Sequence, residues 1–200
     1  MGRLGASWDE LPCTAPPTDV TSCGISLYGS ASGVRNSCGF SLPLAATQHY
    51  NCVVIPGLQS DGLLSAGIHP ATWDEFCQRY GWTEHRQRLL AGLKRALAIL
   101  KAAGCKRVYI DGSFVTAKEV PKDFDGLWEV AGVNPGLLDP VLMNFSGKRE
   151  AQKAKYLGEL FPLIVNPVAA SQALLEFFQT DKASGNPKGI IALDIEGTDL

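Results

Sequence analysis

Two aspartates separated by one residue are the part of this sequence best suited to chemistry. In the segment Asp123-Phe124-Asp125 the carboxylates are two positions apart, so on an extended strand both side chains point to the same face of the sheet. Their oxygens suit Mg²⁺, which accepts one or two carboxylates, keeps some waters and takes the rest of its shell from a substrate phosphate. The pair therefore predicts a magnesium site whose substrate is a nucleotide.

A Gly-Ser pair precedes these carboxylates and complements them. Gly112 lets the backbone approach a ligand closely, and Ser113 offers a hydroxyl and an amide near the start of a predicted helical turn, where anions bind well. A strand over Lys106–Asp111, a turn at Gly112-Ser113 and a second strand over Phe124–Val130 would bring this phosphate cradle beside the metal site.

This order of motifs resembles the nucleotidyltransferase superfamily that includes DNA polymerase β. Longer stretches resemble an uncharacterised bacterial family with the same core, over most of residues 54–195; they are Asp111–Asp125, Ala151–Tyr156 and Phe177–Lys182. The resemblance implies an α/β fold with a nucleotidyltransferase-like mixed β-sheet flanked by helices. It also implies Mg²⁺, a nucleoside triphosphate and transfer of a nucleotidyl group to an acceptor hydroxyl.

The resemblance assigns roles to four residues. Gly112 and Ser113 would hold the triphosphate, while Asp123 and Asp125 would be catalytic carboxylates that bind the metal ion. In two-metal chemistry the metal neutralises the triphosphate and stabilises the leaving pyrophosphate.

The chain departs from the superfamily pattern at two places. A later strand usually supplies a third carboxylate, but the strand predicted over Pro140–Phe145 contains Asn144, and the nearest acid is Asp139, which is the candidate catalytic base. Asparagine brings no negative charge. Gly126 also replaces the bulky apolar residue expected after the second aspartate, which predicts a looser strand.

Four basic residues follow this predicted strand, namely Lys148, Arg149, Lys153 and Lys155. As a cluster they could contact phosphates or RNA, and Lys155 is a candidate substrate-binding residue. The alternative is a solvated helix face, because charge runs on helices commonly have that role.

Helix and strand signals surround these motifs. Thr72 and Glu75 have the capping-box spacing and predict a helix over Trp73–Tyr80, while Thr83 caps a helix over Glu84–Ala103 with Arg86 mostly off its apolar face. The remaining predicted elements are helices over Arg149–Leu160 and Ala170–Gln179 and a strand over Gly189–Ile195.

The bulk composition fits one globular domain with an extension. The chain has 200 residues, 46% of them hydrophobic, and a formal net charge of -2, which does not indicate nucleic-acid or membrane binding. Residues 1–52 are rich in Gly, Ser, Thr, Pro and Ala and predict an irregular or disordered extension, followed by a domain over residues 53–200. No signal peptide or membrane-spanning run is apparent, so we expect a cytoplasmic protein.

Other kinds of site are disfavoured. The six cysteines contain no CxxC pair and are expected to be free thiols in a reducing cytosol. The spacings of Cys23, Cys38, His49 and Cys52 match no usual zinc finger. Three histidines without a GxSxG motif offer no convincing serine-hydrolase triad.

Two functions therefore compete. The first is a magnesium-dependent nucleotidyltransferase that acts on a protein, RNA or small-molecule hydroxyl, and Asp123 and Asp125 favour it. The second is a non-catalytic binding protein with the same fold, such as one half of a toxin-antitoxin pair, and Asn144 favours it.

Overall fold

Five strands in the described part of the chain form one mixed β-sheet. The computed structural model describes residues 55–165 and 169–200, so the extension predicted over residues 1–52 lies outside the described residues. The strand order is β1-β5-β2-β3-β4. The strands are β1 (Gly67–Ala71), β2 (Arg107–Asp111), β3 (Phe124–Glu129), β4 (Gly158–Leu163) and β5 (Gly189–Asp194).

The strand directions bring three strand ends together. β1 runs parallel to β5 and β3 runs parallel to β4, whereas β2 is antiparallel to both of its neighbours, β5 and β3. As a result, the last residue of β2 and the first residues of β3 and β4 meet at one edge of the sheet. All the residues of the candidate site described below come from this edge or from segments beside it.

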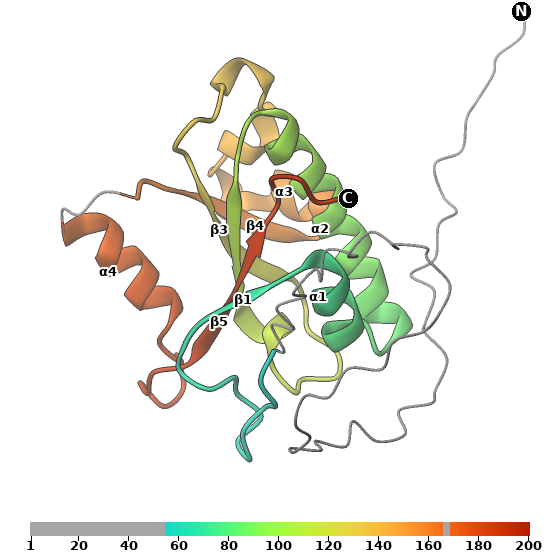
Figure 1. The fold of residues 1–200 in the computed structure, drawn as a ribbon, viewed down its shortest axis with the longest axis vertical. Helices are drawn as coiled ribbons and strands as arrows, with labels where there is room; N and C mark the ends of the chain where they lie inside the picture. Colours follow the sequence, from blue (N-terminus) through green and yellow to red (C-terminus); the bar gives the residue numbers. More distant parts are fainter. Residues whose placement is uncertain (1–54, 166–168) are drawn as a thin grey trace, which may run out of the picture. The chain divides into compact units, whose positions relative to one another are not determined.

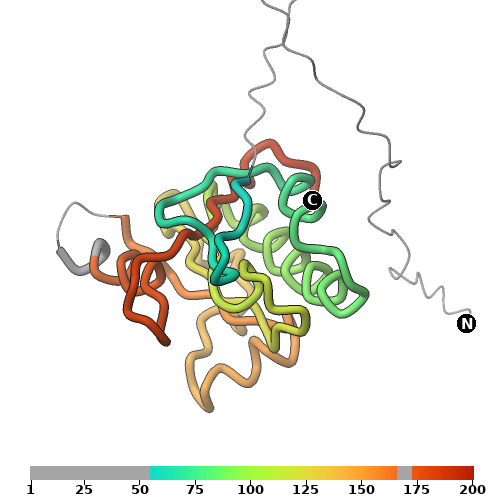
Figure 2. The backbone as a smooth tube through the Cα atoms, turned by 90° about the horizontal axis from the view of Figure 1, so that it is seen from below, coloured from blue at the N-terminus to red at the C-terminus, as the bar shows by residue number. Residues whose placement is uncertain are grey.

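Helices cover both faces of the sheet (Figures 1 and 2). α1 (Trp73–Tyr80), α2 (Glu84–Ala102) and α3 (Glu150–Tyr156) pack with the larger apolar core on one face. α4 (Ala169–Phe178) lies on the opposite face, where Phe178 joins a smaller core that includes Tyr109 and Leu127. The prediction of an α/β fold with a mixed sheet flanked by helices is confirmed at this level.

The first two helices begin where the sequence predicts. The Glu75 amide donates a hydrogen bond of 3.2 Å to the Thr72 hydroxyl, and the Thr72 amide donates one of 2.8 Å to the Glu75 carboxylate, which completes the capping box. The Thr83 hydroxyl likewise accepts a bond of 3.2 Å from the amide of Arg86. The apolar face of α2 is buried as expected, through Leu89, Leu93, Ala96, Leu97 and Leu100.

The prediction for Arg86 is wrong. The sequence predicts this residue mostly off the apolar face of α2, whereas in the structure its side chain is completely buried. Its guanidinium donates to the carbonyls of Tyr80, Lys118 and Phe114. The group also lies 3.7 Å from the centroid of the Trp82 ring. A buried arginine needs such partners, and here they tie α2 to the segment that carries Gly112 and Ser113.

The prediction of a strand over Pro140–Phe145 is wrong, because the chain forms a 3₁₀ turn there. The Asp139 carboxylate accepts a hydrogen bond of 2.9 Å from the Val141 amide, and this cap together with Pro140 starts a 3₁₀ turn, η3 (Pro140–Met143). On the side away from β2, the strand that pairs with β3 is β4. The sequence predicts the first half of β4 as the end of a helix and the second half as no element. α3 ends at Tyr156, and Leu157, with a left-handed φ of 65°, redirects the chain into β4.

Two further differences concern strands. The sequence does not predict β1 as a strand, because it is short and contains Pro70. Proline is found mainly in outer strands of a sheet, and β1 is an outer strand. Gly126 was expected to loosen β3. Instead it allows close packing, since a Cβ there would lie 2.7 Å from the Tyr109 carbonyl oxygen and 2.8 Å from a methyl carbon of Leu160.

Candidate active site

Three carboxylates form a row across the edge of the sheet. Asp111 at the end of β2 is the register partner of Asp125 in β3, and Asp125 is in turn the register partner of Glu159 in β4. Register partners on neighbouring strands project to the same face. This is the face covered by α4, since Tyr109 and Leu127, two positions away on β2 and β3, pack in the core beneath that helix.

The two outer members of the row are paired with cations. Asp111 and Lys188 are both buried, and their charged atoms are 2.6 Å apart. Glu159, also buried, contacts the guanidinium of Arg149 and lies 2.5 Å from the ammonium of Lys153. Asp125, the central member, has no hydrogen bond or ion pair from its carboxylate within the described residues.

Burial and neighbouring charge both act on Asp125. Burial, together with the negative charges of Asp123 and Glu159, raises the pKa of this carboxyl to about 6. The pKa of Asp111 is also raised by burial, against the opposing effect of Lys188. A crowded acid without a partner is the kind of group that a bound cation would stabilise.

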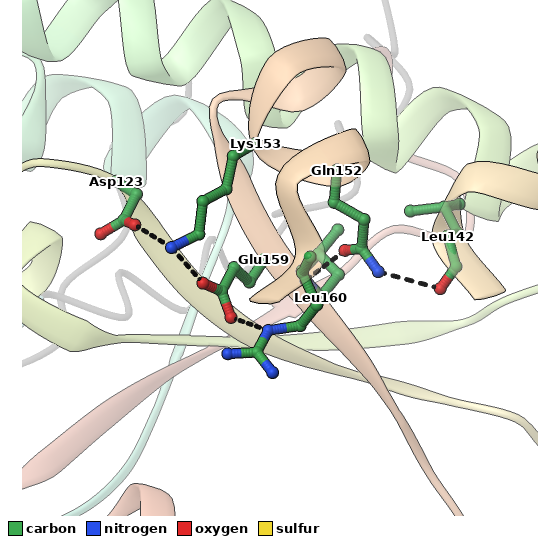
Figure 3. A network of polar contacts seen from close by, with 7 residues as sticks. Asp123, Leu142, Gln152, Lys153, Glu159 and Leu160 are labelled. Carbon is green, nitrogen blue, oxygen red and sulfur yellow. Dashed lines mark hydrogen bonds and ion pairs between the residues drawn. The ribbon is translucent and has the colours of Figure 1, made fainter. Parts of the chain in front are cut away.

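Lys153 links the row to the first aspartate of the Asp123-Phe124-Asp125 motif. Its ammonium lies 3.2 Å from the Asp123 carboxylate and 2.5 Å from that of Glu159, so one α3 side chain bridges two acids (Figure 3). Its side chain is 41% exposed, whereas that of Glu159 is 6% exposed. The bridge is therefore open to solvent on the lysine side.

Gln152 fixes the position of α3 relative to β4. Its side chain is fully buried; the amide nitrogen donates to the Leu142 carbonyl at 3.2 Å and the amide oxygen accepts from the Leu160 backbone at 2.9 Å (Figure 3). A buried amide with both ends satisfied holds its surroundings in one arrangement. Lys153 is the next residue, so this anchor sets where its ammonium reaches.

The Gly-Ser pair lies against the central carboxylate. Gly112 begins a 3₁₀ turn, η1 (Gly112–Val115), with a φ of 80°, and a Cβ there would lie 2.3 Å from Oδ2 of Asp125. Only glycine combines this backbone conformation with such a close approach. The structure thus brings together three of the predicted residues, Gly112, Ser113 and Asp125, in the lining of one cavity.

This cavity, about 690 Å³ in volume, lies between the carboxylate row and α4. The row and the Gly-Ser turn are part of its lining, and the apolar part consists of Phe161 on β4 with Leu174, Phe177 and Phe178 on α4. Arg149, Lys182 and Lys188 add positive charge. A pocket of this size that brings charged side chains together with an apolar surface can hold a small molecule that has both a charged and an apolar part.

Asp139 and Lys155 lie apart from the lining of this cavity. The Asp139 carboxylate accepts hydrogen bonds from the Lys155 ammonium, the Tyr156 hydroxyl and the Val141 amide. Burial acts to raise its pKa, but these hydrogen bonds together lower it below the ordinary value. The two residues are thus each other's partners in a contact that ties η3 to α3.

The predicted basic cluster is largely neutralised by acids. Arg149 and Lys153 pair with Glu159, and Lys155 pairs with Asp139. Lys148 is exposed. Within the described residues these four side chains do not form an open basic patch.

Sequence reasoning missed Glu159, Asp111 and Lys188 as site residues. Glu159 was hidden inside a predicted helix, although Gly158 interrupts that helix and an apolar run follows Glu159. Asp111 was visible as the last residue of a predicted strand, but its partnership with Lys188 joins residues 77 positions apart. No local pattern could reveal that contact.

The donor set at this edge suits a hard cation. The ligands available are carboxylate oxygens, which Mg²⁺ prefers, and one or two of them suffice beside water and phosphate. Within residues 55–165 and 169–200, no three Asp, Glu, His or Cys side chains already form a metal-binding group. The Lys153 ammonium lies between Asp123 and Glu159. A cation bound by these two acids and Asp125 would therefore have to displace it.

The zinc ligands weighed from sequence, Cys23, Cys38, His49 and Cys52, lie outside the described residues. Cys105 is buried, as expected of a small apolar side chain. No helix in the described ranges has both the length and the apolar character needed to cross a membrane.

Comparison with known proteins identifies a family but not an activity. The model of a family described only as a family of unknown function, DUF6932, matches residues 56–194. No curated protein and no solved structure matches the chain.

Proposed function

The chain belongs to the DUF6932 family, whose function is unknown, and from its site we propose that it is a magnesium-dependent nucleotidyltransferase. The donor is a nucleoside triphosphate and the acceptor is a hydroxyl on a protein, RNA or small molecule. The nucleotidyltransferase-like identity of the fold is part of this proposal. The observation that carries it is the Asp125 carboxylate, which has no hydrogen bond or ion pair among the described residues and lies against Gly112 in a cavity that also contains cations.

The residues of the cavity and the neighbouring Asp123 would share the work of this reaction. Asp123 and Asp125 would hold Mg²⁺, with Glu159 as a third carboxylate once Lys153 moves away. The bound metal would supply charge neutralisation on the triphosphate. Gly112 and Ser113 would place the triphosphate by close backbone approach and a hydroxyl hydrogen bond.

The transfer itself requires little covalent work from the protein. The acceptor oxygen forms a bond to the α-phosphorus, the bond from that phosphorus to the bridging oxygen breaks, and pyrophosphate leaves with the electron pair. The acceptor proton passes to a carboxylate. Catalysis by such a site rests on positioning and on electrostatic stabilisation.

The test is nucleotide binding with and without magnesium. We would titrate ATP, GTP, CTP and UTP into wild type, Asp125→Asn and the control Asp74→Asn, which alters an exposed aspartate of α1, and follow the melting temperature. Wild type and the control should show a magnesium-dependent rise that Asp125→Asn lacks. An absence of any shift in wild type would contradict the proposal.

A second candidate is a non-catalytic binding protein, such as one half of a toxin-antitoxin pair. The observation that favours it is the engagement of Asp123 and Glu159 by Lys153, because acids that the chain's own cation satisfies do not require a metal ion. A tight protein partner without any nucleotide affinity would support this candidate.

A further inference from the structure

Three phenylalanine rings in contact with one another, here called the aromatic ladder, belong to the apolar lining of the cavity. Phe178, at the end of α4, meets Phe161 edge to face at 6.0 Å between ring centroids and 70° between planes. Phe177 meets Phe178 in the same way, at 6.0 Å and 69°. Phe178 is buried in the core beneath α4, so the ladder is anchored at its centre.

Phe177 is the accessible end of this ladder. It is 59% exposed and it lines the cavity that contains Asp125 and the Gly-Ser turn. Exposing so much of a phenylalanine to water is unfavourable. Phe178 and Lys182 contact this ring, but its 59% exposure leaves apolar ring surface inside the cavity against which a flat ligand can stack.

The ammonium of Lys182 lies over the Phe177 ring. The Lys182 ammonium lies 5.9 Å from the Phe177 centroid, and it has no ion pair within the described residues. The turn that carries it is held by Asp181, whose carboxylate accepts hydrogen bonds from the Ala183 and Ser184 amides and from the Ser184 hydroxyl. Lys182 also acts electrostatically on Asp111 and Asp125, so its charge is felt at the carboxylate row.

We propose that Phe177 is the stacking platform for the nucleobase of the nucleotide, with Lys182 contacting its phosphates. This inference rests on the proposed function. The occupant follows from continuity, because the aromatic side and the Gly-Ser side belong to one cavity. A ligand that spans both must join an anionic part to a flat apolar part, and a nucleotide does so.

The apolar lining of the cavity also indicates which nucleobases the site would prefer. Phe161, Leu174, Phe177 and Phe178 offer no side-chain hydrogen bonds with which to read the edge of a base. Stacking tolerates every base because each has a π-face. We therefore expect purines, with their larger rings, to bind more tightly than pyrimidines, and little discrimination between adenine and guanine.

The experiment separates the base from the phosphates. Binding of ATP, UTP and inorganic triphosphate, each with Mg²⁺, is measured by calorimetry for wild type and for Phe177→Ala, Phe177→Leu and Phe177→Trp. Phe177→Ala should weaken ATP binding about tenfold or more and leave inorganic triphosphate within about twofold. Phe177→Trp should preserve ATP binding, and Phe177→Leu, which keeps apolar area without a π-face, should not.

The control is Phe145→Ala, another exposed phenylalanine, which stacks on Phe161 without lining the cavity. It should leave both ligands unaffected. Triphosphate and ATP binding to wild type with no loss of ATP affinity in Phe177→Ala would overturn this inference and leave the proposed function standing. An equal loss of both ligands would also overturn it. No binding of either ligand to wild type would overturn both proposals.

Discussion

Asp125 and Glu159 are register partners on the parallel strands β3 and β4, so two carboxylates stand side by side on one face of the sheet. Like charges in such positions destabilise a sheet by up to about 1 kcal/mol. Burial of Asp125 adds to this cost, as the raised pKa of about 6 indicates. The adjacent carboxylates of Asp125 and Glu159 therefore reduce the stability of the fold. Destabilising arrangements of this kind are common at functional sites.

The first prediction follows from this repulsion. Replacing Asp125 with Asn should raise the free energy of unfolding at neutral pH, without divalent cations, by about 1 kcal/mol. Urea denaturation measures the change, with Asp74→Asn as the exposed control. A variant less stable than wild type would show that the Asp125 carboxylate has a structural partner.

The second prediction concerns Lys153, whose ammonium bridges Asp123 and Glu159. Lys153→Met should destabilise the metal-free protein by about 1–2 kcal/mol, because hydrogen bonds to charged groups are lost while Arg149 still neutralises Glu159. The same variant should gain a larger rise in melting temperature from Mg²⁺ than wild type, since the ion no longer competes with the ammonium.

A matched variant for this experiment is Lys148→Met, which removes an exposed lysine close by. It should change neither the stability nor the response to Mg²⁺. Equal magnesium responses in Lys153→Met and wild type would mean that the ion, if it binds, does not use the acids that Lys153 bridges.

The third prediction isolates the contact between Gly112 and Asp125. Alanine at position 112 would meet both a left-handed backbone, with φ of 80°, and the Asp125 carboxylate. Alanine at Gly185, with φ of 72° and nothing within 4 Å of the added Cβ, meets only the first. Gly185→Ala should cost about 1–2 kcal/mol, and Gly112→Ala should cost at least about 1 kcal/mol more.

A double variant completes this comparison. In an Asp125→Ala background the additional cost of Gly112→Ala should disappear, because the obstructing side chain is gone. An additional cost that persists would place the obstruction elsewhere in η1.

The sequence predicted those parts of the site that are local in the chain. The Thr72 and Thr83 caps, β2, β3 and the Gly-Ser turn before Asp125 depend on neighbouring residues, and each was recognised. The row formed by Asp111, Asp125 and Glu159 depends on which strands pair. Strand pairing is set by contacts between distant segments, so it could not be read from periodicity.

The error at Pro140–Phe145 has a local cause. An apolar run of this length fits a strand by composition, but Asp139 caps its first turn and Pro140 suits the first position of a helical turn. Giving weight to the cap before the apolar run would have left the third strand to be sought elsewhere, and the structure has it at Gly158–Leu163. Glu159 would then have been recognised as an acid on the strand beside β3.

The fourth prediction tests whether Asp139 has a structural role or acts as the base. Its lowered pKa means that the folded state favours the ionised form, so its stabilisation is present above the unfolded value of 3.8 and is lost as pH falls through the folded pKa. Asp139→Asn should therefore be about 1–2 kcal/mol less stable than wild type near neutral pH. That difference should shrink as the pH falls below 3.8 and through the lower folded pKa.

Urea denaturation at several pH values measures this difference, and nucleotide binding provides the second readout. A structural Asp139 predicts that Asp139→Asn, where it remains folded, binds Mg²⁺ and nucleotide as wild type does. A difference in stability that does not depend on pH would show that the carboxylate charge is not what Lys155 and Tyr156 stabilise.

The fifth prediction concerns Arg86, which supports the Gly-Ser turn from beneath. Its guanidinium satisfies the carbonyls of Tyr80, Phe114 and Lys118, two of which follow Gly112 in the chain. Arg86→Met keeps the apolar stem but leaves these carbonyls without their donor, and should cost about 3 kcal/mol or more. Arg88→Met, at an exposed position of the same helix, should change the stability by less than about 0.5 kcal/mol. Because Phe114 lies in η1, a folded Arg86→Lys variant should also bind nucleotide more weakly than Arg88→Lys, and equal affinities would show that Arg86 stabilises the fold without shaping the site.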